Sequence, residues 1–129
     1  MIDDLLAEAD LTISQVDAIA FGRGPGSFMG LRIAAGVVQG IAFAHDIPVI
    51  PVSTLKAIAQ RAYDETGLSN VMVAIDARMD EVYWSAYHLD GSDWSTIEEE
   101  CVISPDRLDV KTTMSQKEGD WVAAGTGWS

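Results

Sequence analysis

The sequence predicts an α/β domain with a mixed sheet flanked by helices. Strand-like and helix-like segments alternate from residue 16 to residue 67, the order that packs helices against a sheet. A glycine-rich turn, Gly22-Arg23-Gly24-Pro25-Gly26-Ser27, joins the first of these strands to a long apolar helix. After Asp80 the pattern changes to aromatic-rich runs separated by a turn, which predicts antiparallel strands added to the same sheet.

The first half of the chain is expected to hold three helices and two strands. Ser27 is a suitable N-cap for the long helix, and Gly67 is a suitable stop for the one that follows. Apolar spacing predicts helices over Met1–Ala9, over Phe28–His45 and from Ser53 or Thr54 to Asp64, and β-branched runs predict strands over Val16–Phe21 and Pro48–Val52.

The second half is expected to consist mainly of strands. A tight link over Asp76–Asp80 and a turn over Asp90–Asp93 separate the first three of them. We predict strands over Val71–Ile75, Glu81–His88, Thr96–Ile103 and Trp121–Ala124, and a weak helix over Pro105–Leu108.

Size, charge and cysteine content limit the possible functions. The chain has 129 residues, and its hydrophobic content of 48% is enough to build the core of one domain. The net charge of −12 argues against a broad nucleic-acid surface, so any RNA contact should be local or supplied by a partner. Cys101 is the single cysteine, which favours a reducing compartment, and acidic residues near the N-terminus argue against a signal peptide. We therefore expect a cytoplasmic protein.

The Phe28–Ala44 segment is apolar enough to raise the question of a membrane span. It is barely long enough to cross a bilayer, and it contains Arg32, Gln39 and several glycines. We therefore expect this segment to be buried in a soluble core and to make no membrane contact.

The glycine turn, with Gly24, Gly26, Ser27 and Gly30, is a candidate anion site because unpaired N–H groups and the helix dipole attract anions at a helix N-terminus. No Lys-Ser or Lys-Thr pair follows it, however, and its glycines miss the G-x-G-x-x-G spacing by one residue. Two interpretations remain open. Either the turn binds a phosphate, or its glycines only permit a tight turn and close helix packing.

No catalytic site can be assembled from the residues. Asp76 follows a strand and has Arg78, Asp80 and Glu81 beside it, but aspartate is common in turns and Arg78 can pair with either carboxylate. The two histidines lie far apart, and no nucleophile has a base and an orienting acid at a recognisable spacing. We predict no catalytic residue, no metal site and no cofactor.

The long helix divides into two faces at helical spacing. One is an apolar stripe suited to covering a sheet, formed by Ile33, Ala34, Val37, Val38, Ile41 and Ala44. The other, called here the outer stripe, is formed by Arg32, Gly36, Gln39, Gly40 and Phe43. Glycine destabilises a helix interior, and this loss is compensated only where a neighbouring helix or chain approaches the backbone closely. We predict that the outer stripe packs against another helix or chain, with a purely internal contact as the alternative.

Several ordered motifs of the chain resemble those of the bacterial TsaB family, also called YeaZ. They are the segments Gly22–Arg32, Ile47–Leu55, Ile75–Trp84 and Gly125–Trp128, which together cover essentially the whole chain. Met29 is a departure, because the family usually has threonine there, and the loss of its hydroxyl removes any hydrogen bond made at that position in relatives.

The resemblance implies a fold like the actin and Hsp70 ATPase superfamily, called ASKHA or ribonuclease H-like. It also implies a non-catalytic scaffold in the machinery that adds threonylcarbamoyl to an adenosine in tRNA. Such a subunit pairs with the catalytic paralogue TsaD, joins TsaE in a ternary complex, forms a homodimer when alone and meets tRNA only through the complex. We expect the interface to comprise Leu5 and Leu6 of the first helix together with the outer stripe.

The resemblance also implies that this chain performs no catalysis. The catalytic paralogue carries an H-x-x-x-H pair just after the strand that matches Pro48–Val52, where this chain has Thr54 and Ile58, neither of which replaces imidazole as a metal ligand. A nucleotide-binding small-molecule enzyme and an M22-type glycoprotease-like peptidase remain the alternatives. Relatives begin with a strand pair and continue past the final glycine turn. We therefore expect residues 1–129 to be one domain, incomplete at both ends, with a second domain starting near 125–129.

Overall fold

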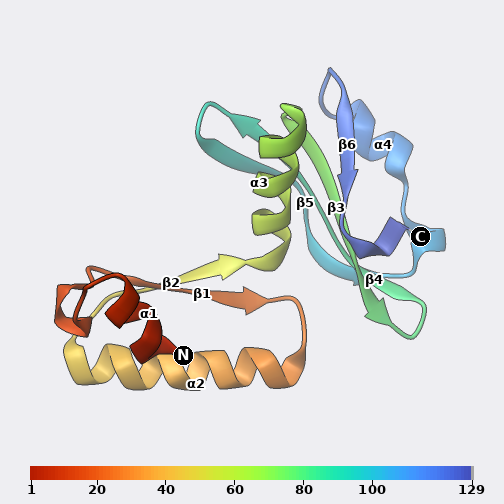
Figure 1. The fold of residues 1–129 in the computed structure, drawn as a ribbon. Coiled ribbons are helices and arrows are strands. Elements are labelled where there is room, and N and C mark those ends of the chain that lie inside the picture. Colours follow the sequence, from red (N-terminus) through yellow and green to blue (C-terminus); the bar gives the residue numbers. More distant parts are fainter. Residues whose placement is uncertain (129) are drawn as a thin grey trace. The chain divides into compact units, whose positions relative to one another are not determined.

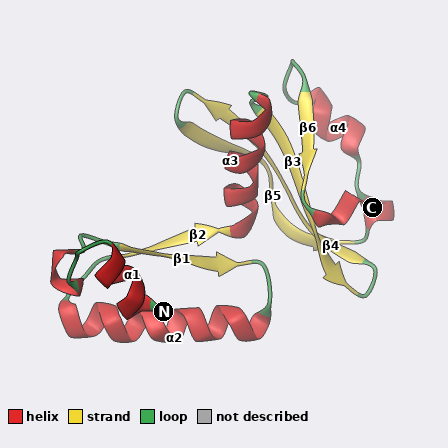
Figure 2. Cartoon of the chain, in the orientation of Figure 1, coloured by secondary structure: helices red, strands yellow, loops and turns green. Residues whose placement is uncertain are grey.

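The computed structural model describes residues 1–128, which form two compact units, Met1–Val52 and a second one from Ser53 onward. Figure 1 follows the chain through both units, and Figure 2 marks their helices and strands. One sheet has two strands and the other has four. The predicted mixed sheet is the four-stranded one. The expectation that all strands join one sheet is wrong for the described residues, because the first two strands pair only with each other.

The first unit is a strand–helix–strand arrangement preceded by a short helix. Its two strands point the same way in Figure 1, and the long helix α2 connects the first strand to the second. The amide of Ile19 donates a hydrogen bond of 3.0 Å to the carbonyl of Pro48. In chain order the elements are α1 (Ile2–Glu8), a 3₁₀ turn (Ile13–Gln15), β1 (Ile19–Gly24), α2 (Phe28–His45) and β2 (Val49–Ser53).

The strand β1 lies further along the chain than the sequence predicts. A 3₁₀ turn capped reciprocally by Thr12 and Gln15 precedes it, and the strand begins only at Ile19. It then continues through Gly24, so that half of the predicted glycine turn is extended strand. Glycine has low intrinsic strand preference, and pairing with β2 overrides that preference here.

The second unit is a four-stranded sheet with helices on both faces, in the strand order β5-β4-β3-β6. β3 and β4 pair antiparallel, as do β4 and β5, whereas β6 runs parallel to β3, which confirms the mixed sheet. Its elements are α3 (Thr54–Thr66), β3 (Asn70–Arg78), β4 (Glu81–Asp90), β5 (Asp93–Ile103), a 3₁₀ turn (Pro105–Arg107), α4 (Val110–Ser115), β6 (Trp121–Ala124) and a final 3₁₀ turn (Thr126–Trp128).

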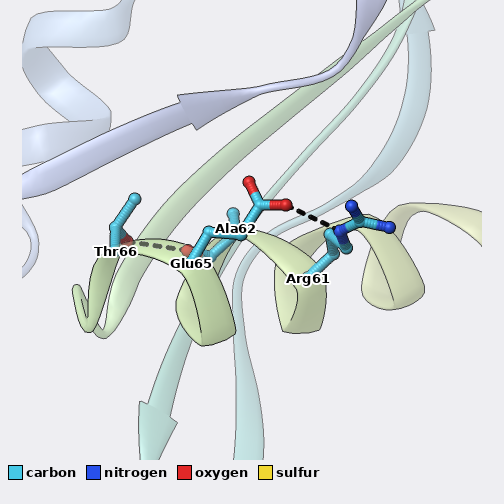
Figure 3. Close-up of polar contacts among 4 residues, drawn as sticks. All are labelled: Arg61, Ala62, Glu65 and Thr66. Carbon is cyan, nitrogen blue, oxygen red and sulfur yellow. Dashed lines mark hydrogen bonds and ion pairs between the residues drawn. The ribbon is translucent and has the colours of Figure 1, made fainter.

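The helix α3 begins and ends where its capping residues dictate. Ser53 is the N-cap, and Gly67 ends the helix with a φ of 72°, a conformation that glycine adopts without strain. In the last turn, Figure 3 shows the Thr66 hydroxyl donating to the carbonyl of Ala62 at 2.7 Å and an exposed ion pair of 2.7 Å between Arg61 and Glu65. The helix therefore extends two residues beyond the predicted Asp64.

The core of the second unit lies on both faces of its sheet. Buried residues of α3, including Leu55 and Ala59, pack with Val71, Val73 and Tyr87 on one face. On the other face the buried side chains are Met72, Ala74, Val82, Trp84 and Ala86, covered by partly buried residues of β5, α4 and β6. The weak helix predicted from Pro105–Leu108 is a 3₁₀ turn over Pro105–Arg107, and α4 begins separately at Val110. Only Thr113 of this helix is buried, so its apolar periodicity is too weak to read.

Candidate functional site

Local structure at the start of α2 explains Ser27 and Gly24 of the glycine turn. The Ser27 hydroxyl accepts a hydrogen bond of 3.4 Å from the Gly30 amide, which confirms Ser27 as the N-cap. Gly24 has a φ of 100°, and a Cβ there would lie 2.7 Å from Cδ1 of Leu31. The backbone conformation therefore favours glycine at this position, and any larger residue would also displace the end of the Leu31 side chain. Gly26 has open space around it and does not have a positive φ.

The face of α2 that packs on its own unit differs from the predicted apolar stripe. Ala34, Val38 and Ile41 are half-buried as expected, but Ile33 and Val37 are 63% and 45% exposed. The predicted stripe is therefore half wrong, and the half-buried row follows a strict i, i+3, i+4, i+7 spacing. Three alanines in this row allow close approach to the sheet, while Ile33 and Val37 lie outside it. The row consists of Leu31, Ala34, Ala35, Val38, Ile41 and Ala42.

All five residues of the outer stripe are exposed, and so are two apolar residues at the start of α2. Phe43 is 93% exposed, and Phe28 and Met29 are exposed close to the helix start. The one charge of the outer stripe, the guanidinium of Arg32, lies 5.3 Å from the ring centroid of Phe28, a cation–π arrangement. An apolar surface of this extent, with Gln39 as its other polar member, is typical of an interaction site.

The two glycines of the outer stripe have no internal partner among the described residues. A Cβ built on Gly36 or Gly40 meets no atom within 4 Å. Neither glycine therefore has a close contact within the first unit. Glycines at i and i+4 on an exposed apolar helix face allow a second helix to approach closely.

α2 also qualifies by length and composition as a candidate membrane span. Its 18 residues have a mean hydropathy of 1.3, and no residue of the helix is buried. The expectation that this segment is buried in a core is therefore wrong for the described chain. Core helices of soluble proteins pass the same test of length and composition, and one face of α2 packs on β1.

Leu5 and Leu6 belong to a separate apolar groove in the first unit. The groove has a volume of about 340 Å³ and includes Ile41 of α2 but no residue of the outer stripe. The structure therefore does not bring Leu5 and Leu6 together with that stripe in one pocket. The lining residues are Ile2, Leu5, Leu6, Ile13, Val16, Ala18, Ile19, Ala20 and Ile41.

The acidic residues around the β3–β4 turn line a polar cleft in the second unit. Asp76, Asp80 and Glu81 meet Asp106 there, in a volume of about 440 Å³. Sequence reasoning missed Asp106, because only the fold of the 3₁₀ turn at Pro105–Arg107 brings it to this edge. Within residues 1–128, no group of three or more His, Cys, Asp and Glu side chains is arranged to hold a metal ion.

The two histidines belong to different units. His88 Nδ1 lies 2.7 Å from Oδ1 of the buried Asn70, and His45 ends α2 in the first unit. Thr54 and Ile58 lie on the first turns of α3 and are half-buried.

Comparisons with known proteins agree on the family. Residues 1–127 match the family model of TsaD, tRNA N6-adenosine threonylcarbamoyltransferase. The proteins named tRNA threonylcarbamoyladenosine biosynthesis protein TsaB from Escherichia coli K12 and Haemophilus influenzae are 44% and 46% identical over 99% and 100% of this chain. The chain spans 55% and 56% of their lengths, which is about half of each relative.

A solved structure supports the same relationship. A crystal structure of a Pseudomonas aeruginosa protein described as similar to peptidase YeaZ superposes with a TM-score of 0.90 at 54% identity. The superposition covers 99% of this chain and 58% of that one. The chain therefore belongs to the TsaD-type threonylcarbamoyltransferase family, and the relatives that it resembles carry the names TsaB and YeaZ.

Proposed function

We propose that this chain is part of a TsaB-type subunit of tRNA threonylcarbamoyladenosine biosynthesis and that it binds a TsaD-type partner through α2. One observation carries the proposal. Gly36 and Gly40 lie on an exposed apolar helix face, and a Cβ on either would meet no atom of the first unit within 4 Å. Glycine destabilises a helix relative to alanine. Close packing of a partner helix across the two glycines would compensate for this loss of stability.

The proposed role is that of a non-catalytic scaffold. Thr54 and Ile58 supply no imidazole. The sequence shows no nucleophile with a base and an orienting acid at a recognisable spacing. The scaffold acts by binding TsaD, with TsaE joining a ternary complex and tRNA contacted only through the assembly. When TsaD is absent, the same face pairs two copies of the chain. The site of action is the cytoplasm, and the chain works without a cofactor.

Copurification of this chain with TsaD from the same organism tests the proposal. The wild-type chain is expected to retain TsaD, whereas Gly36→Leu and Gly40→Leu should lose it and keep the wild-type circular dichroism spectrum. Both positions have open space around them, so the added side chain has no internal clash. Glu65→Leu on the exposed face of α3 is the matched control and should retain TsaD. Retention of TsaD by both glycine variants would overturn the proposed interface.

Calorimetry of the same chain with ATP and ADP tests the nucleotide-binding alternative. The scaffold role predicts no heat of binding from the chain alone. Robust binding that Gly26→Leu abolishes would support the alternative instead, because Gly26 lies in the turn before α2 and has open space around it.

A further inference from the structure

A cluster of buried hydroxyl groups surrounds one glutamate in the second unit. Oε1 of Glu100 accepts hydrogen bonds from the Ser53 hydroxyl and, at 3.1 Å, from the Tyr87 hydroxyl. Ser53 and Tyr87 are only 4% and 1% exposed. Ser53 oxygen also accepts the Lys56 amide hydrogen at 3.3 Å, which caps the first turn of α3.

An irregularity in β5 turns Glu100 toward α3. Across the β4–β5 ladder, Trp84 pairs with Cys101 and Ala86 pairs with Glu98. Between these two pairs the chain advances by three residues in β5 but by only two in β4. In a regular strand Glu98 and Glu100 would share one face. The extra residue separates them. Oε1 of Glu98 accepts from Gln116 beside α4, and Glu100 accepts from Ser53 at α3.

The direction of the hydrogen bonds gives Glu100 a specific task. A serine hydroxyl has one proton, and an N-cap must use its oxygen lone pairs to accept from the helix amides. Because Glu100 takes the proton of Ser53, the oxygen of Ser53 is left oriented toward the Lys56 amide. The Tyr87 hydroxyl holds the same carboxylate oxygen in place. A carboxylate beside the N-terminus of α3 is also favoured by the helix dipole.

We propose that Glu100 is a positioning residue that orients the Ser53 cap and thereby fixes the first turn of α3. Ser53 is both the last residue of β2 and the first residue of the second unit. The chain therefore enters the second unit at a point held by three hydrogen bonds that converge from α3, β4 and β5.

Hydrogen exchange of the whole chain measures the proposed effect at the Lys56 amide. Glu100→Ala should raise the exchange rate of that amide roughly three- to tenfold, the range expected for loss of a helix cap. Glu100→Gln should restore most of the protection, because its amide oxygen accepts both hydroxyl hydrogens. Glu99→Ala, at the exposed neighbouring position, is the matched control and should leave the rate unchanged.

A double variant separates orientation of the cap from general support of the fold. In a Ser53→Ala background, Glu100→Ala should cause no further increase in Lys56 exchange, because the hydroxyl that Glu100 orients is already gone. Additive effects would overturn the proposal, as would a rise spread evenly over β3, β4 and β6. Glu100→Asp withdraws the carboxylate by one methylene and should reproduce the local loss if Glu100→Ala does not fold.

Discussion

Gly36 and Gly40 lie one helical turn apart on α2, and a Cβ on either would meet no atom within 4 Å. Both residues are exposed, and neither is among the glycines with a positive φ. Packing within the first unit and backbone conformation therefore do not account for them. Contact with a second helix is the explanation proposed above, because the absence of a side chain lets two helix backbones approach closely.

The first prediction is that Gly36→Ala and Gly40→Ala each stabilise the chain. Alanine in a helix interior is favoured over glycine by about 0.5–1 kcal/mol, and nothing obstructs the added methyl group. Urea unfolding should show a higher free energy of unfolding for each variant, while association with the partner weakens. A lower free energy of unfolding would show that the glycines serve the chain's own fold.

The second prediction is that Gly127→Ala has the opposite sign. A Cβ there would lie 2.9 Å from both the carbonyl carbon and the Cβ of Ala74, and 3.0 Å from Cγ1 of Val82. Overpacking of this kind costs typically about 1–3 kcal/mol. Urea unfolding of Gly127→Ala beside Gly36→Ala tests both signs in one experiment. A neutral result at Gly127 would mean that the segment after β6 moves aside freely.

Local signals explain why so much of the fold could be predicted from the sequence. The bounds of α2 and β6 match the prediction, and Ser27 and Gly67 cap helices as expected. These features depend on spacing and capping within a few residues. The pairing of β1 with β2 and the irregular register of β5 depend on distant partners, and this is why the prediction misplaced β1 and did not find the position of Glu100.

The candidate surface was predictable to the extent that helical periodicity defines it. All five residues of the outer stripe are exposed, as their spacing indicates. The opposite face was half wrong because hydrophobicity alone favoured Ile33 and Val37, whereas close packing on a two-stranded sheet selects Ala34 and Ala35. When apolar residues occur on nearly every side of a helix, the hydrophobic pattern does not identify which face packs against the sheet.

The third prediction concerns stability at alkaline pH. Burial raises the pKa of Tyr87 above its ordinary value of 10.0, and the charge of Glu100 acts in the same direction, whereas the neighbouring Ser85 and Ser53 hydroxyls lower it by a smaller amount. Above pH 10.0 the unfolded chain therefore loses this proton before the native one does. The native state then binds more protons, so the free energy of unfolding falls as pH rises through the native pKa.

Tyr87→Phe tests this dependence, because phenylalanine has no proton to lose. Urea unfolding at a series of pH values on either side of 10.0 should show a shallower alkaline decline for Tyr87→Phe than for the wild-type chain. The two curves should run parallel below pH 10.0. Parallel curves above pH 10.0 as well would contradict the raised pKa.

The fourth prediction concerns Asn70, which ties the start of β6 to β3. Its side-chain amide donates to the carbonyls of Glu118 and Asp120 at 3.1 and 3.3 Å, and its oxygen faces His88. Asn70 is buried, so Asn70→Ala leaves polar groups without partners, at a cost of about 1–3 kcal/mol. Asn70→Asp keeps the shape but turns a carboxylate oxygen toward two carbonyl oxygens. It should therefore destabilise the chain at neutral pH at least as much as alanine does, as measured by urea unfolding. An aspartate variant as stable as the wild-type chain would show that the two carbonyls do not depend on this donor.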